Sequence, residues 1–157
     1  ISENNKMLKK LFIILVSGLI LTSCAGTQKN VNSGGSITAG SQEDLIVNVG
    51  DRVFFEFDSF ELTVDGQSTL DAQAAWLKQY SDVNVTIEGH ADERGTREYN
   101  LALGEKRANA VFTYLMDAGI SNSRMNTVSF GKERPEVVGS TDSAWSQNRR
   151  SVTTVTN

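Results

Sequence analysis

One stretch of this chain constrains its fold more than any other: an alternating apolar run that leads through a polar turn into a long helical pattern. Apolar and polar residues alternate over 83–88, which is typical of a half-buried strand. Apolar residues then recur at helical spacing. Thr96 stands where an N-cap hydroxyl is favoured, and Gly119 stands where a left-handed C-terminal cap is favoured. The sequence therefore predicts a strand over 83–88 and a helix over 96–118, joined by a polar turn.

The predicted helix has two distinct faces. We expect its buried stripe to contain Leu101, Ala108, Val111, Phe112 and Leu115. Asn100, Gly104 and Arg107 are spaced four and three apart, so they share a second face. Because glycine lacks a side chain, we expect Gly104 to leave a shallow bare patch between the amide and the guanidinium, near Asp92 of the turn.

Asp92 and Arg107 suit a ligand that carries both an ammonium and a carboxylate. Asp92 would hold the cation, and Arg107 would bind the anion through its planar fork. The alternative is an Asp92–Arg107 ion pair on the surface, which would contribute almost nothing to stability. The spacing alone leaves both interpretations open.

Several short motifs extend across the globular part of the chain. GHADERGT at Gly89 to Thr96 is followed in the helix by YN, LGE and RANAV. Further motifs are FxFD at Phe55 to Asp58, FGKERP at Phe130 to Pro135 and QNRR at Gln147 to Arg150. With these motifs the chain resembles the OmpA-like peptidoglycan-binding domains over roughly Val53 to Val155, and among them most closely the peptidoglycan-associated lipoproteins.

This resemblance implies non-covalent binding to peptidoglycan through the diaminopimelate residue of its stem peptide. Carried over at matching positions, Asp92 and Arg107 are the central pair, and Asn100 supports the pocket. The other residues implied to line it are Arg94, Phe57, Asp58 and Leu103, and Arg149 receives a supporting role. The resemblance also implies docking to the Tol system, chiefly TolB, with roles in envelope integrity and cell division.

The N-terminal region is typical of an exported lipoprotein. After residues 1–6, which we interpret as an upstream extension, Met7 begins a basic stretch and an apolar run that ends at Leu21. This run is shorter than the about 20 residues that span a bilayer. It ends in Leu-Thr-Ser-Cys24, which resembles a bacterial lipobox, so residues 1–23 are a predicted signal peptide and Cys24 a predicted lipidation site. More than one acyl chain on Cys24 would give stable anchoring to a membrane. The resemblance implies that this membrane is the outer membrane and that the domain faces the periplasm.

The rest of the chain divides into a tether and one domain. Residues 24–44 are rich in Gly, Ser, Thr, Gln and Asn, which is typical of a flexible tether. Residues 45–157 suffice for a single core. We predict strands at 53–57, 83–88, 125–130 and 150–155, helices at 63–79 and 96–118, and a helical turn at 143–147. This βαβαβ order plus a final strand predicts an α/β (α+β sandwich) fold of the OmpA-like type, a single mixed sheet with helices packed on one face.

Several other functions are excluded or less favoured. The formal net charge of −4 argues against nucleic-acid binding. His90 is the only histidine and no GxSxG elbow occurs, so we predict no catalytic site, cofactor or histidine-rich zinc site. Two alternatives stay open. One is a protein–protein interaction domain without wall binding, and the other is a metal-assisted hydrolase at His90, Asp92 and Glu93. We expect His90 instead to support the loop through a hydrogen bond.

Overall fold

The computed structural model describes residues 36–156, so the predicted signal peptide, the lipidation site Cys24 and most of the tether lie outside the described residues. The elements in chain order are α2 (Gln42–Asn48), β1 (Arg52–Phe54), α3 (Val64–Gln79), β2 (Val85–His90), α4 (Arg97–Asp117), a 3-10 turn (Asn122–Arg124), β3 (Met125–Gly131), α5 (Asp142–Asn148) and β4 (Arg150–Val155). Among these residues, none of the helices has the length and apolar character that a membrane span requires.

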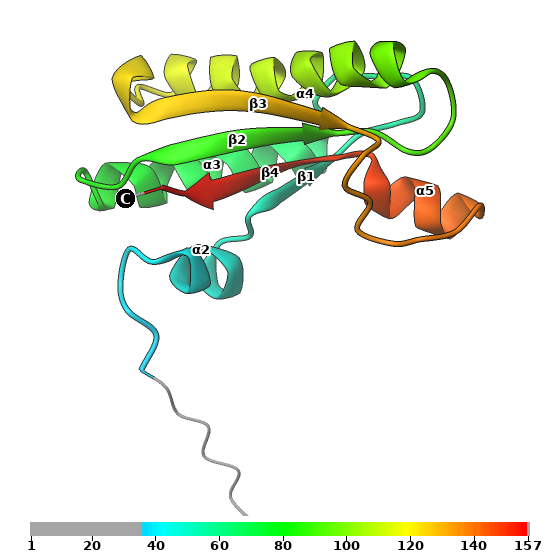
Figure 1. The fold of residues 1–157 in the computed structure, drawn as a ribbon. Helices are drawn as coiled ribbons and strands as arrows, with labels where there is room; N and C mark the ends of the chain where they lie inside the picture. The colour runs from blue at the N-terminus through cyan, green and yellow to red at the C-terminus, as the bar shows by residue number, and fades with distance from the viewer. Residues whose placement is uncertain (1–35, 157) are drawn as a thin grey trace, which may run out of the picture. The chain divides into compact units, whose positions relative to one another are not determined.

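The four strands form one mixed sheet in the order β1-β4-β2-β3. β4 runs antiparallel to both of its neighbours, whereas β2 and β3 are parallel. The last strand of the chain therefore lies between the first two. The long helices α3 and α4 both lie behind the sheet in Figure 1, which is the predicted arrangement of helices on one face.

The hydrophobic core lies between the sheet and these two helices. Val85 and Ile87 of β2 are fully buried, and they belong to one cluster with Leu70 of α3 and Leu115 of α4. The end of α4 has the predicted geometry. Gly119 has a φ of +97°, and the N–H of the next residue donates to the carbonyl oxygen of Leu115 at 3.0 Å. This is the pattern of a Schellman cap.

The strand β1 is shorter than the predicted strand 53–57. Its pairing with β4 covers only three residues, and the N–H of Phe55 makes the last contact, to the carbonyl oxygen of Arg149 at 2.9 Å. The chain then turns, and Asp58 adopts a φ of +54°. Phe57 is consequently 61% exposed in a turn and does not face the core.

The strand β2 begins and ends two residues later than the predicted strand 83–88. Its pairing with β3 continues across an irregularity after Gly89, so that His90 pairs with Gly131. His90 therefore belongs to the strand, and the polar turn begins at Ala91.

Ala108, Val111 and Leu115 of α4 are buried in the core as predicted, but the other two residues of the predicted stripe are not. Leu101, expected in the core, is 49% exposed, and Phe112 is only partly buried. The face with Asn100, Gly104 and Arg107 is instead buried. A β-carbon on Gly104 would lie 2.8 Å from the carbonyl oxygen of Gly89. The prediction of a bare patch at Gly104 was therefore wrong, because the sheet occupies that space.

The helix α2 was not predicted and begins inside the expected tether 24–44. The hydroxyl of Ser41 caps it by accepting from the N–H of Asp44 at 3.2 Å. The carboxylate of Asp44 also accepts from the indole N–H of Trp76 at 2.9 Å, which ties α2 to α3. Leu45 is fully buried. The compact unit starts at Ser36.

Candidate functional site

A pocket of about 190 Å³ opens where β2 ends and the following turn leads into α4. The residues that line it are Phe57, Asp58, Asp92, Arg94, Gly95, Tyr99, Asn100, Leu103 and Arg107. The structure thus brings all seven predicted pocket residues together from three separate segments of the chain. Gly95 and Tyr99 also line the pocket and were not predicted.

A larger cavity of about 540 Å³ runs along β1 and the first turn of α3. None of the seven predicted residues lines it, but Arg149 does. We take the smaller pocket as the candidate site, because buried groups of opposite charge converge there.

The pocket has a buried floor and an exposed rim. On the floor, Asp92 and Arg107 are 5% and 0% exposed, and Asn100 and Leu103 are also buried. On the rim, Phe57 and Tyr99 are 61% and 51% exposed. A ligand would therefore meet aromatic surface first and buried charge below it.

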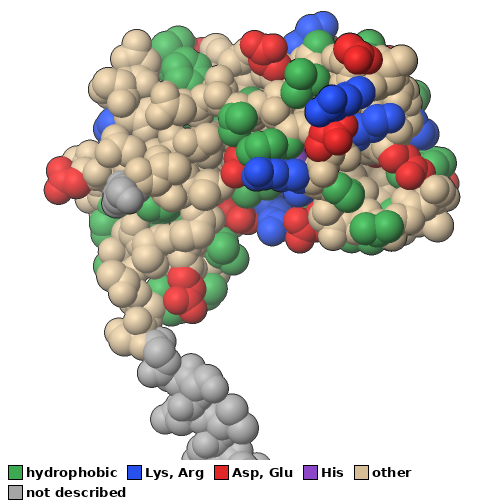
Figure 2. Space-filling view, in the orientation of Figure 1, with side chains coloured by type: hydrophobic (Ala, Val, Ile, Leu, Met, Phe, Trp, Pro, Cys, Tyr) green, Lys and Arg blue, Asp and Glu red, His purple; other side chains and the backbone are tan. Residues whose placement is uncertain are grey.

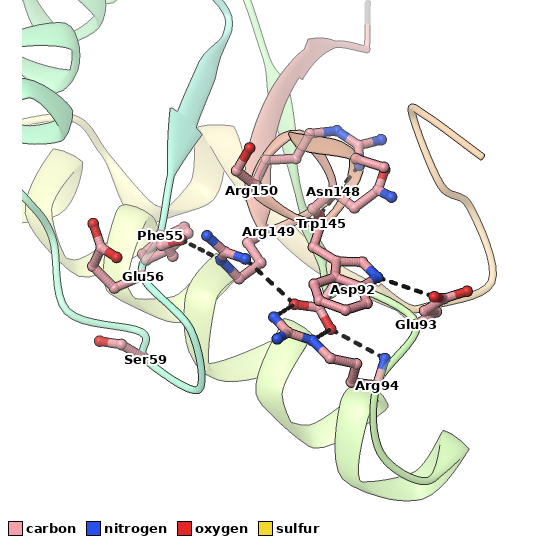
Figure 3. Close-up of polar contacts among 12 residues, drawn as sticks. Phe55, Glu56, Ser59, Asp92, Glu93, Arg94, Trp145, Asn148, Arg149 and Arg150 are labelled. Carbon is pink, nitrogen blue, oxygen red and sulfur yellow. Dashed lines mark hydrogen bonds and ion pairs between the residues drawn. The ribbon is translucent and has the colours of Figure 1, made fainter. Parts of the chain in front are cut away.

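Asp92 is held by two arginines, as Figure 3 shows. The Nε and Nη2 atoms of Arg94 lie 3.1 Å from Oδ1 and 2.6 Å from Oδ2, and the backbone N–H of Arg94 donates to Oδ1 at 3.1 Å. A nitrogen of Arg149 approaches Oδ2 at 3.6 Å. Burial acts to raise the pKa of Asp92, but the hydrogen bonds from Arg94 and the charges of both arginines outweigh it and lower that pKa. Asp92 is therefore an ionised, fully partnered carboxylate.

Arg107 joins three backbone segments beneath the pocket. Its guanidinium donates to the carbonyl oxygens of Ser59 at 2.8 Å, His90 at 2.8 Å and Glu56 at 3.1 Å. Burial and the charge of Arg149 lower the pKa of Arg107 to about 10, so it is still protonated at neutral pH. The alternative of a surface ion pair with Asp92 was wrong, because both side chains are buried and Asp92 pairs with other arginines.

Asp58 presents a carboxylate at the rim. The hydroxyl of Tyr99 donates to Oδ1, and this bond raises the pKa of Tyr99. Among the described residues, Oδ2 has no hydrogen-bond partner. A positive φ is rare for a residue other than glycine and costs conformational energy, so the surrounding turn must hold Asp58 in this position.

The turn between β2 and α4 is held by side chains from outside it. Asn100 donates to the carbonyl oxygen of Arg94 at 2.8 Å, the supporting position that the resemblance implied. Lys132 donates to the carbonyl oxygens of Glu93 at 3.1 Å and Gly95 at 2.7 Å. Lys132 was not singled out from the sequence, although it lies within the FGKERP motif.

The side chains of His90, Asp92 and Glu93 do not converge. Nε2 of His90 lies 3.2 Å from a carboxylate oxygen of Glu88, whereas Glu93 accepts from the indole of Trp145 at 3.0 Å. Within residues 36–156, no group of three or more His, Cys, Asp or Glu side chains could hold a metal ion. These three side chains therefore do not form the ligand set that the metal-assisted hydrolase alternative requires. His90 supports the site through its backbone carbonyl, which accepts from Arg107.

Charged groups of both signs are mixed on the face seen in Figure 2, where Lys and Arg side chains lie beside Asp and Glu. A long polyanion on this face would meet acidic groups next to the basic ones. This mixed distribution of charge thus suits a small ligand with separated positive and negative groups better than a long polyanion.

Residues 54–149 match the profile of the OmpA family. The chain belongs to the OmpA family. It is 52% identical to the peptidoglycan-associated lipoprotein of Rhizobium meliloti over 148 residues, which cover 90% of this chain and 84% of that protein. It is 38% identical to the peptidoglycan-associated lipoprotein of Pasteurella multocida, with 94% and 97% of the two chains covered.

Solved structures confirm the fold. The crystal structure of the peptidoglycan-associated lipoprotein from Burkholderia pseudomallei matches with a TM-score of 0.66 and 42% identity, over 68% of this chain and 90% of that one. The C-terminal domain of Helicobacter pylori MotB has a TM-score of 0.64 at 18% identity, over 68% and 84% of the two chains, which shows a common fold alone. The OmpA-like α/β fold that the motifs implied is thus confirmed, in a family of non-enzymatic structural proteins.

Proposed function

We propose that this chain is an envelope lipoprotein that binds peptidoglycan non-covalently through the diaminopimelate of its stem peptide. One observation carries the proposal: the seven residues implied by family resemblance, from three segments of the chain, line a single pocket. The relatives named peptidoglycan-associated lipoprotein, at 38% to 52% identity, support it.

The size of the pocket favours one amino-acid side chain over a whole peptide. Its volume of about 190 Å³ is below the about 300 Å³ at which sites for drug-sized ligands begin. Diaminopimelate ends in an ammonium and a carboxylate on one carbon. The pocket offers the carboxylates of Asp58 and Asp92 for the ammonium, and the buried guanidinium of Arg107 for the carboxylate.

Asp58 is the acceptor most available to the ammonium, because Oδ2 has no partner among the described residues. Asp92 adds a negative field from the floor, and each new contact there would compete with Arg94. Arg107 offers positive charge while its hydrogen bonds hold the floor together.

Two further parts of the proposal rest on resemblance. Lipidation at Cys24 would anchor the chain in the outer membrane, with the domain in the periplasm. Docking to TolB would join it to the Tol system, which acts in envelope integrity and cell division. Loss of membrane association in a Cys24→Ser variant would support the first part, and capture of purified TolB would support the second.

The test of the proposed function is binding to purified sacculi and to two synthetic stem peptides, one with diaminopimelate and one with lysine, which lacks the terminal carboxylate. We expect the protein to bind sacculi and to prefer the diaminopimelate peptide by about tenfold or more, the value of a charge-assisted hydrogen bond. Asp58→Asn should weaken binding of both peptides, whereas the exposed Asp82→Asn should not. No binding to sacculi, or equal binding of the two peptides, would refute the proposal. Capture of TolB without sacculus binding would favour the protein-interaction alternative.

A further inference from the structure

The rim of the pocket carries the guanidinium of Arg94, which contacts aromatic rings and a carboxylate. The guanidinium of Arg94 packs against two aromatic rings, with its central carbon 4.1 Å from the centroid of Phe57 and 4.0 Å from that of Trp145. One of its edges, Nε and Nη2, is bound to Asp92. Two ring contacts and one bound edge thus restrict the orientation of this guanidinium.

The remaining edge of this guanidinium is open. Nη1 of Arg94 has no hydrogen-bond partner among the described residues, and the side chain is 33% exposed. The carboxylates of Asp142 and Glu93 act on Arg94 from a distance, but neither forms an ion pair with it. Glu93 is already bound to the indole N–H of Trp145. An arginine edge of this kind matches a carboxylate through two parallel hydrogen bonds.

A bound stem peptide must cross this rim. The pocket accommodates roughly one side chain, so the neighbouring residues of the peptide lie outside it, over Phe57, Arg94 and Tyr99. The charged groups on the rim are Asp58 and Arg94, and of these only Arg94 is positive. A second carboxylate on the peptide would therefore meet Arg94.

We infer that Arg94 forms a second anion subsite, which binds a carboxylate on the peptide residue next to diaminopimelate. This inference rests on the proposed function and adds to it a preference for the chemical form of the neighbouring peptide residue. The pocket binds the terminal ammonium and carboxylate of diaminopimelate. Arg94 on the rim distinguishes a free carboxylate on the neighbouring peptide residue from a carboxamide. Phe57 and Trp145 restrict the orientation of the guanidinium, so that little conformational entropy is lost when the carboxylate binds.

The test uses two diaminopimelate peptides that differ only in the preceding residue, which carries a free carboxylate in one and a carboxamide in the other. We expect the wild-type protein to prefer the carboxylate peptide by about tenfold. Arg94→Gln should reduce this ratio to near one. Arg97→Gln is the matched control, because Arg97 is the first residue of α4 and its side chain is 74% exposed. This variant should leave the ratio of the two affinities unchanged.

Taking a ratio of two affinities removes any common effect of Arg94→Gln on Asp92 or on folding, and thermal melting of each variant gives the folded fraction. A wild-type ratio near one, or an unchanged ratio in Arg94→Gln, overturns the second subsite. These outcomes are distinct from failure of the proposed function, in which neither peptide binds or lysine replaces diaminopimelate without loss.

Discussion

A β-carbon built on Gly89 would lie 1.7 Å from the carbonyl oxygen of Gly104, so the backbones of β2 and α4 are in direct contact. This contact sets the depth of the pocket, because β2 carries Asp92 just beyond its end and α4 carries Arg107 one turn beyond Gly104. Side chains at either glycine would push the two elements apart.

Gly104→Ala tests this contact. In an exposed helix position the change would stabilise the helix by about 1 kcal/mol. Here the new methyl would lie 2.8 Å from the backbone oxygen of Gly89 and 2.3 Å from the hydroxyl of Ser129. We therefore expect a net loss of about 1–3 kcal/mol in the free energy of unfolding, measured by urea denaturation. The neighbouring exposed Glu105→Ala should change it by less than about 0.5 kcal/mol. A Gly104→Ala variant more stable than the wild type would contradict the contact.

Arg107→Ala should unfold the domain more easily, in addition to any effect on binding. It leaves the carbonyl oxygens of Glu56, Ser59 and His90 without this donor, and of the three bonds the one to His90 is buried. We expect a cost of about 1–3 kcal/mol for the unsatisfied buried oxygen, and the loss of the fully buried Arg107 side chain adds to it. Thermal or urea unfolding measures it, with Arg97→Ala as an exposed arginine control. Equal stability of the two variants would show that Arg107 does not hold the floor together.

His90 should make the domain less stable in mild acid. Burial and the charge of Arg150 lower the pKa of folded His90 to about 4, whereas the unfolded residue titrates at about 6.5. Between these values the unfolded state binds the extra proton, so stability falls as the pH falls from 6.5 to 4.

Between pH 7 and pH 5 this amounts to about 2 kcal/mol. The measurement is the free energy of unfolding of the wild type and His90→Gln at both pH values. His90→Gln should lack this decrease in the free energy of unfolding between pH 7 and pH 5, because the chain has no other histidine. Parallel pH profiles for the two proteins would argue against a buried neutral His90.

Lys132 should matter for binding more than for stability. Its ammonium holds the carbonyl oxygens of Glu93 and Gly95 and thereby the turn that carries Arg94. We expect Lys132→Met to weaken binding of the diaminopimelate peptide several-fold while the melting temperature changes little. Lys132→Arg should restore part of the loss, because a guanidinium can reach the same carbonyls. The control is Lys78→Met on the exposed side of α3. Wild-type affinity in Lys132→Met would show that the turn keeps its shape without this side chain.

Local features of the fold were predictable because each depends on residues a few positions apart. Thr63 and Thr96 cap their helices as expected, and Gly119 ends α4 in a left-handed conformation. The seven residues that the resemblance implied line one pocket. The helix α2 escaped prediction because its stability depends on a distant partner, the indole of Trp76.

The sequence by itself determined the order of the four strands and the two long helices, the caps Thr63, Thr96 and Gly119, and the family that the chain resembles. Only the tertiary structure decided that the buried face of α4 includes Gly104 and Arg107, with Arg107 bound to backbone carbonyls and Gly104 in contact with Gly89. It also decided that Asp92 pairs with Arg94 and Arg149. The physical reason is the range of the interactions. Caps and periodicity act within a turn or two, whereas the partner of a buried charge is set by segments that packing brings together.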